Sequence, residues 1–82
     1  MEIVLEDLFV EQFEKCPAQF QEKFRKVYQQ LKAVDKPLEV KNIVASIHTK
    51  NFYKLFIDES RIGLQIKTGK LHLLCFLFNQ YF

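Results

Sequence analysis

The sequence predicts an α+β protein in which an N-terminal helical hairpin packs on a small, twisted antiparallel β-sheet. Apolar residues at helical spacing dominate the first half of the chain. Runs of branched and aromatic residues, separated by turn residues, dominate the second half. A chain of 82 residues is expected to form one domain, residues 1–82.

Residues 52–78 are the clearest part of the predicted sheet, because their apolar pattern agrees with two tight turns. Asp58-Glu59 and Thr68-Gly69 are the expected turns, and Gly69 supplies the positive φ that such a turn needs. The strands are then Phe52–Ile57, Ser60–Lys67 and Lys70–Phe78.

These turns place one apolar set of residues on a single face, because side chains alternate along a strand and opposed residues share a face. A slip of one residue in either turn would destroy this face. Its expected members are Tyr53, Leu55, Ile57, Ile62, Leu64, Ile66, Leu71, Leu73, Cys75 and Leu77.

The opposite face of the predicted sheet mixes cations with aromatic residues, which suits a polyanion with stackable bases. An alternative of equal weight is that the C-terminus or a partner chain covers the aromatics, while the lysines are simply solvated. The residues on this face are Phe52, Lys54, Phe56, Arg61, Gly63, Gln65, Lys67, Lys70, His72, Leu74, Phe76 and Phe78.

The elements before residue 35 are predicted from alternation and helical spacing. Glu2–Leu5 alternates and predicts a short first strand. Asp7 can cap a helix that continues to about Lys15. Pro17 ends that helix, and the apolar stripe of residues 20, 24, 27 and 31 predicts a second helix from Ala18 to about Val34.

Leu38–Asn51 is less periodic and predicts a long connection, with at most a short helical turn. Ile43, Val44 and Ile47 are expected to tuck under the sheet. Lys41, His48 and Lys50 form a polar approach to its cation-bearing face.

Charge and composition exclude several classes of protein. Residues 1–40 hold eight acids and six bases, whereas residues 41–82 hold six bases and two acids, which hints at a nucleic-acid face on the sheet. The longest uncharged apolar run, Leu71–Phe78, is far below the ~20 residues that span a bilayer. The acidic N-terminus does not resemble a signal peptide. A cytoplasmic protein with reduced, buried Cys16 and Cys75 is expected.

The side chains present favour chemistry without a metal or cofactor. The sequence has no glycine-rich phosphate loop, no Cys/His metal set and few carboxylates after Glu39. Metal-free RNA cleavage needs a base for the 2′-hydroxyl, cations for the phosphorane and an acid for the leaving oxygen. Lys54 and Arg61 are expected to be diagonal neighbours that supply charge, and Lys54 or His72 is the candidate base. Tyr81 is the candidate acid if the C-terminus folds back over the sheet.

The expected RNA-binding residues surround this catalytic set: Lys41, His48, Lys50, Phe52, Phe56, Gln65, Lys67 and Lys70. The alternative is that Lys54 and Arg61 form a solvated hairpin end, and that His72 is an ordinary strand residue.

The order of these elements resembles the RelE/ParE superfamily of toxins from bacterial toxin–antitoxin systems. An opening strand (MEIVLED) leads into a helical hairpin with a proline at its bend (VEQFEKCPAQFQEKFRKVYQQL). The stretch FYKLFIDESRIGLQI and the final strand LHLLCFLF follow. The segment YKL…D-x-x-RI is similar to the family's most recognisable part, although the motif is short and degenerate.

The resemblance implies a RelE-like fold, a cognate antitoxin, and mRNA cleavage on the ribosome without a metal. By position, Lys54 and Arg61 match the family's phosphate-facing basic residues. Family members usually follow the last strand with a basic residue and then a tyrosine. Here Phe78-Asn79-Gln80-Tyr81-Phe82 follows, so Tyr81 alone can stand in.

Two other functions are compatible with the sequence. A ParE-like or catalytically silent module would act by protein contact, for example on DNA gyrase. A relative that shares only the fold would use its exposed aromatics to form a homodimer.

Overall fold

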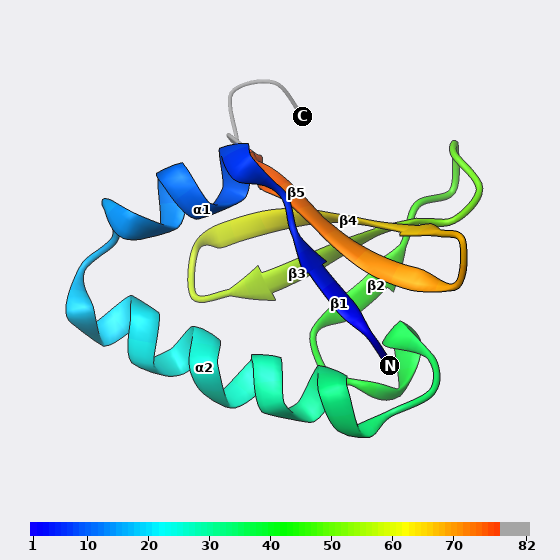
Figure 1. Cartoon of the computed structure of the whole chain (residues 1–82), viewed down its shortest axis with the longest axis horizontal. Coiled ribbons are helices and arrows are strands. Elements are labelled where there is room, and N and C mark those ends of the chain that lie inside the picture. Colours follow the sequence, from blue (N-terminus) through cyan, green and yellow to red (C-terminus); the bar gives the residue numbers. More distant parts are fainter. Residues whose placement is uncertain (78–82) are drawn as a thin grey trace.

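The computed structural model describes residues 1–77, which form two helices, a short 3₁₀ helix and five strands. Figure 1 shows α1 and α2 together along one side of the sheet. In chain order the elements are β1 (Ile3–Leu5), α1 (Asp7–Glu14), α2 (Ala18–Ala33), η1 (Pro37–Glu39), β2 (Ile43–Ala45), β3 (Phe52–Ile57), β4 (Ser60–Lys67) and β5 (Lys70–Leu77).

The sheet is mixed, with the strand order β1-β5-β4-β3-β2. The predicted meander of β3, β4 and β5 is confirmed, but β1 pairs with β5 in parallel, so the expected purely antiparallel sheet is wrong at this edge. A parallel neighbour requires a crossover connection, and the hairpin of α1 and α2 lies in the long connection between these strands. The two edge strands each have three residues. Short edges limit unwanted pairing with other chains.

The register of β3 and β4 is the predicted one. Leu55 pairs with Ile62 and Phe56 with Arg61 across the turn at residues 58–59. At the second turn Thr68 and Gly69 both have positive φ, 48° and 77°. That is the pattern of the primed turns, whose twist matches the flanking strands.

A β-bulge changes the second half of β5. The predicted pairing holds from the turn to Leu64 opposite Leu73, and then Gly63 pairs with Cys75, which leaves Leu74 as an extra residue. The bulge reverses the faces of the residues that follow. The expected places of Cys75 and Leu77 on the helix-covered face are therefore wrong, and Phe76 takes that face instead.

Both helices follow their predicted ranges, with small differences at the ends. Glu6 rather than Asp7 is the N-cap residue of α1, and its side chain makes no capping hydrogen bond. Pro17 precedes α2, where its fixed φ suits the start of a helix. Lys23 on α2 pairs with Asp58 in the β3–β4 turn at 2.9 Å, but both side chains are more than half exposed. Such a pair contributes ~1 kcal/mol or less.

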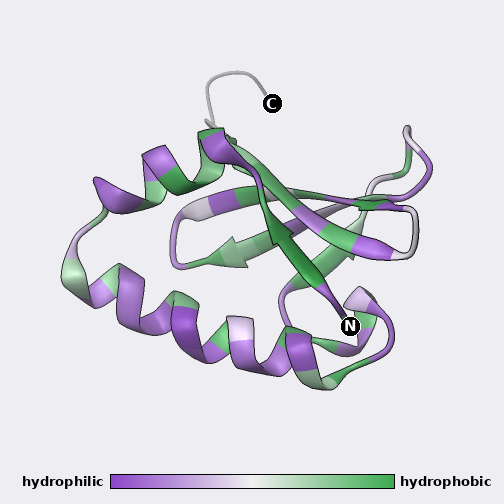
Figure 2. Ribbon diagram, viewed as in Figure 1, coloured by the Kyte–Doolittle hydropathy of each residue, from purple (hydrophilic) through white to green (hydrophobic). Residues whose placement is uncertain are grey.

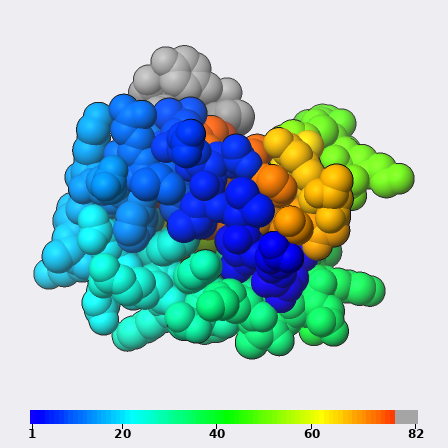
Figure 3. Space-filling model, viewed as in Figure 1, coloured from blue at the N-terminus to red at the C-terminus, as the bar shows by residue number. Residues whose placement is uncertain are grey.

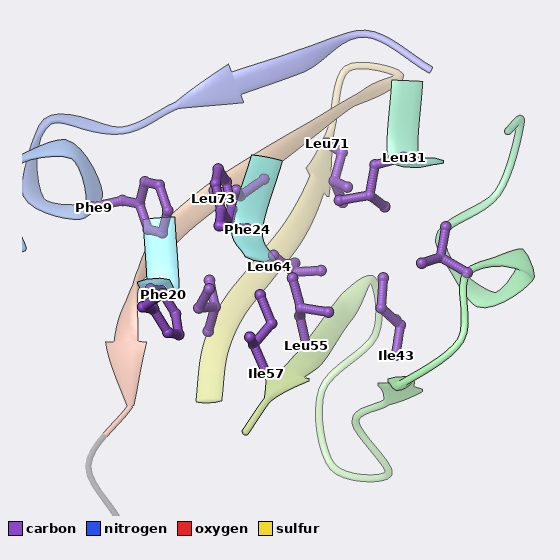
Figure 4. Close-up of a cluster of buried hydrophobic side chains, with 12 residues drawn as sticks. Phe9, Phe20, Phe24, Leu31, Ile43, Leu55, Ile57, Leu64, Leu71 and Leu73 are labelled. Carbon is purple, nitrogen blue, oxygen red and sulfur yellow. The ribbon is translucent and has the colours of Figure 1, made fainter. Parts of the chain in front are cut away.

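The core lies between the helices and one face of the sheet. Phe9, Phe20 and Phe24 point from the helices toward leucines and isoleucines of β3, β4 and β5 in Figure 4. Figure 2 shows the matching pattern along α2, where hydrophilic residues alternate with the hydrophobic ones that face the sheet. Each fully buried side chain of this kind stabilises the fold by ~1.5–3 kcal/mol. The buried apolar residues are Phe9, Phe20, Phe24, Leu31, Val40, Ile43, Leu55, Ile57, Ile62, Leu64, Leu71 and Leu73.

The segment predicted as a connection contains a strand, β2, that forms one edge of the sheet. Ile43 is buried as expected, but Val44 is 47% exposed and Ile47 is 90% exposed, so the prediction that they tuck under the sheet is wrong. Strand pairing explains Val44, because neighbouring side chains on a strand point to opposite faces. Ile47 lies beyond the strand, in the β2–β3 loop.

The geometry of the β4–β5 turn predicts how one substitution changes the stability of the fold. Thr68 is β-branched and has φ 48°, a conformation that such residues rarely adopt. Thr68→Asn creates the Asn-Gly pair that this turn favours, and should raise the free energy of unfolding by about 0.5–1.5 kcal/mol. Chemical denaturation of both proteins measures the change. Thr49→Asn, in a loop at ordinary φ, is the control and should change stability by less than about 0.5 kcal/mol.

The bulge in β5 predicts which of two substitutions in this strand reduces stability more. Phe76 stacks on Phe9, with ring centroids 5.4 Å apart, and also contacts Phe20. Phe76→Ala should therefore reduce the free energy of unfolding by about 2–4 kcal/mol, and Leu77→Ala by no more than about 1.5 kcal/mol. Urea unfolding compares the two variants. A larger loss for Leu77→Ala would mean that β5 runs without the bulge.

Candidate nucleic-acid interface

Lys54 and Arg61 lie on the face of the sheet away from the helices, called here the open face. Lys54 pairs with Gly63 and Phe56 pairs with Arg61, so the two cations are diagonal neighbours on adjacent strands. Diagonal neighbours in a sheet lie about 7–8 Å apart, which long side chains span. The predicted juxtaposition of the two cations is therefore present in the fold, and both side chains are half-buried.

Two aromatic residues accompany these cations on β3. The Arg61 guanidinium carbon lies 5.7 Å from the centre of the Phe56 ring, a cation–π contact that holds the guanidinium over the face of the ring. Phe52 lies further along the same strand, opposite Gln65. Both rings are half-buried, and each keeps some surface on the open face.

A cavity of about 190 Å³ lies beside Lys54. Its floor includes Gly63, whose missing side chain leaves room between the strands. An added Cβ at Gly63 would meet the Leu77 side chain at 3.5 Å, an ordinary contact. The cavity joins the sheet to the β2–β3 loop, and its lining residues are Ser46, Thr49, Phe52, Tyr53, Lys54, Gly63, Leu74, Cys75 and Leu77.

The bulge in β5 gives this cavity much of its apolar wall. It turns Cys75 and Leu77 onto the open face, where they lie with Lys54. Both side chains are half-buried, so the prediction of a buried Cys75 is wrong, as it is for Cys16. The sequence pattern missed this wall because it assumed an uninterrupted strand.

His72 lies on the open face but is held away from the Lys54–Arg61 pair. It pairs with Gln65, on the strand next to β3, and its Nδ1 contacts Glu6 Oε2 at 2.5 Å. The side chains of His72 and Glu6 are 15% and 37% exposed. Two strand spacings, about 10 Å, separate His72 from the strand of Lys54. No local sequence pattern indicates the Glu6 contact, because 66 residues separate the partners.

The other predicted RNA-binding residues occupy three places around the open face. Gln65 is half-buried between Phe52 and His72. Lys67 and Lys70 flank the β4–β5 turn, and Lys70 Nζ lies 3.3 Å from Glu2 Oε2. Carboxylates of the N-terminal segment therefore meet two of the predicted residues, Lys70 and His72.

The remaining predicted cations lie at the two ends of β2. Lys41 precedes the strand, near the end of β3 that carries Phe56, since Phe56 N donates to Asn42 O. His48 and Lys50 are exposed in the loop at the opposite end. The structure thus separates Lys41 from the other two. Tyr81, the predicted acid, lies outside the described residues.

A larger hollow, of about 500 Å³, lies between the start of α2 and the β3–β4 turn. Its walls include Cys16, Phe20 and the Lys23–Asp58 pair. The lysine there is already neutralised by an aspartate, so the hollow has little attraction for a polyanion. The cavity beside Lys54 is the better candidate for nucleic acid, because it lies on the face that also carries Arg61 and the Phe52 ring.

Residues 1–77 contain neither a metal-binding cluster nor a membrane-spanning helix. No group of three or more His, Cys, Asp or Glu side chains there could hold a metal ion. No helix in this part of the chain is long and apolar enough to cross a membrane.

The fold is similar to that of a solved toxin–antitoxin structure. A chain of the RelB–RelE antitoxin–toxin complex from Methanococcus jannaschii superposes with a TM-score of 0.80. The match covers 95% of this chain and 92% of that chain, at 14% sequence identity. No family model and no curated protein sequence matches this chain.

This likeness shows that the chain has a RelE-like α+β fold, as the sequence resemblance implied. At 14% identity it carries no information about individual site residues.

The Glu6–His72 contact predicts how the stability of the fold depends on pH. The hydrogen bond from His72 holds the pKa of Glu6 below its usual 4.5, and the charges of His72 and Lys67 act in the same direction. A lowered pKa means that the folded state binds this proton less readily than the unfolded state. The contact therefore stabilises the fold above about pH 4.5, and its contribution is lost as Glu6 becomes protonated below that pH.

Thermal unfolding from pH 7 to pH 3 tests this assignment. Glu6→Gln should lower the midpoint near neutral pH and flatten its fall on acidification. Glu11→Gln, which removes an exposed carboxylate from α1, is the matched control. If both variants follow the wild-type profile, Glu6 has no part in the acid response.

Proposed function

We propose that this chain is the toxin of a toxin–antitoxin module, a RelE-like endoribonuclease that cuts mRNA on the ribosome and blocks translation. The observation that carries the proposal is the diagonal pair Lys54 and Arg61, beside a cavity on the open face of a RelE-like fold. Two cations at this spacing can bind one phosphate group from two sides. The cavity of about 190 Å³ is large enough for part of one nucleotide.

The chemistry assigned to this face is metal-free transesterification. A base takes the proton of the 2′-hydroxyl, and that oxygen attacks the adjacent phosphorus. The bond to the 5′-oxygen then breaks, and an acid supplies the proton that this oxygen needs. Arg61 and Lys54 stabilise the negative charge that develops on the phosphorane oxygens, which is the largest contribution expected from a site of this kind. Lys54 is the remaining candidate base, because Glu6 holds His72 away from this pair. When Lys54 takes that role, Arg61 supplies the positive charge, and the candidate acid, Tyr81, lies outside the described residues.

A cognate antitoxin protein is part of the proposal. The structurally similar chain comes from a complex of an antitoxin with a toxin. An antitoxin of this chain would inhibit it by covering the open face. The cations there, Lys54 and Arg61, favour an acidic segment as the covering element.

A second function, binding without catalysis, is favoured by one observation. The imidazole of His72, the candidate base on the strand β5, is already engaged by Glu6. A ParE-like toxin that inhibits DNA gyrase by contact would need no such base. A homodimer formed through the half-buried Phe52 and Phe56 is a further alternative.

Induced expression in a bacterial host tests the proposed activity. Wild type, Arg61→Ala and the control Arg25→Ala are compared for growth and for the integrity of a translated reporter mRNA. Arg25 has the same charge but lies on α2, where it pairs with Glu22. Wild type and Arg25→Ala should arrest growth and cut the mRNA on the ribosome. Arg61→Ala should cut it at least ~100-fold more slowly, because a charge-stabilising group is gone.

The other outcomes separate the alternatives. Growth arrest with intact mRNA would contradict the ribonuclease and support a binding module, which purified gyrase then tests directly. Equal cleavage by wild type and Arg61→Ala would remove Arg61 from the site. Light scattering of the purified protein decides whether it is a homodimer.

A further inference from the structure

Ile47 is the most exposed large apolar side chain within residues 1–77, with 90% of its surface accessible. The next is Leu38, at 56%. A fully exposed isoleucine contributes nothing to the core, and burying it elsewhere would gain about 1.5–3 kcal/mol. Figures 1 and 3 show that the loop of residues 46–51 projects from the body of the molecule.

The conformation of this loop is fixed by hydrogen bonds at both ends. Ser46 Oγ accepts from the backbone N–H groups of His48 and Thr49, both at 3.3 Å. At the base, Ser46 N donates to Phe52 O at 2.8 Å, and Ile66 N donates to Asn51 O at 2.9 Å. A side chain on a loop with such bonds is presented to a partner at little cost in conformational entropy.

The charge of the surrounding hairpin identifies the kind of partner. Residues 40–57 include four titratable bases, Lys41, His48, Lys50 and Lys54, and not one aspartate or glutamate. Residues 60–82 form a longer stretch without an acid, but Glu2 and Glu6 contact two of its bases, Lys70 and His72. A polyanion is the partner that such a surface attracts.

The composition of the tip argues against a protein partner. The neighbours of Ile47 in the loop are His48, Thr49, Lys50 and Asn51, all polar and exposed. The energetic centre of a protein interface is usually several packed apolar or aromatic residues within a polar rim. One apolar residue among cations instead matches proteins that bind nucleic acid, which insert Ile, Leu or Phe against unstacked bases while basic residues contact phosphates.

We propose that the β2–β3 loop, residues 46–51, docks on structured RNA of the ribosome. Ile47 packs against an unstacked base, and Lys50 and His48 contact the flanking phosphates. Ser46 and Thr49 also line the cavity beside Lys54, so the docked loop fixes the position of the cleavage face relative to the RNA. This inference rests on the proposed function, which makes the ribosome the target. The contact that it adds is separate from the Lys54–Arg61 pair.

Co-sedimentation of the full chain with vacant bacterial ribosomes tests the loop without any mRNA present. Ile47→Asn should weaken binding at least ~10-fold, which corresponds to about 1.4 kcal/mol. Ile47→Leu keeps the apolar contact and should bind within about twofold of wild type. Leu38→Asn, an exposed apolar residue on η1, is the control and should bind as wild type. Lys50→Gln should weaken binding and reduce the slope of log affinity against log salt by about one.

Each remaining outcome is decisive. If wild type and Ile47→Asn sediment equally with ribosomes, the loop proposal is overturned while the proposed function stands. If wild type does not bind ribosomes at all, both are overturned. Binding to purified ribosomal RNA identifies what Ile47 contacts. If Ile47→Asn binds this RNA as wild type does but binds ribosomes more weakly, Ile47 contacts a ribosomal protein, and the RNA contact is refuted. A change in self-association on Ile47→Asn would refute it in favour of a dimer.

Discussion

Phe9, Phe20 and Phe24 hold the two helices against one face of the sheet, and the other elements are arranged around this contact. The Phe9 ring packs on that of Phe24, and Phe9 and Phe20 both pack on Phe76, with centroids 5.3 to 5.6 Å apart. Because both helices occupy the same side, no helix within residues 1–77 covers the opposite face of β3, β4 and β5. The fold thus divides its sheet into a face that stabilises the molecule and a face that is available for binding.

Alternation of apolar residues was sufficient to predict β3, β4, both turns and the diagonal placement of Lys54 and Arg61, because a wrong register would have buried charge. The bulge at Leu74 escaped prediction, since the run from Leu73 to Phe78 is apolar at every position and gives no alternation to follow. The strand β2 was missed because three residues are too few to show a period. The Glu6–His72 contact depends on the tertiary fold alone.

Charge is distributed so that the N-terminal segment neutralises one side of the open face. Glu2 and Glu6 meet Lys70 and His72, and the charge of Lys67 also acts on Glu6. The other bases on the open face and its rim belong to the β2–β3 hairpin and to Arg61. A long-range attraction to a polyanion would therefore orient the molecule with this hairpin foremost. The orientation agrees with a docking role for the loop and a chemical role for the strand behind it.

The parallel pairing of β1 with β5 has a consequence for how the protein is made. The strand β1 finds its partner only among the last described residues, so this edge of the sheet closes only after residues 6–70 have been synthesised. Contacts between residues so far apart in sequence form slowly, because closing the long loop costs conformational entropy before the contacts stabilise the fold. A nascent chain would keep the edge of β5 and the residues beside it uncovered. During that interval the incomplete sheet is most open to pairing with another chain.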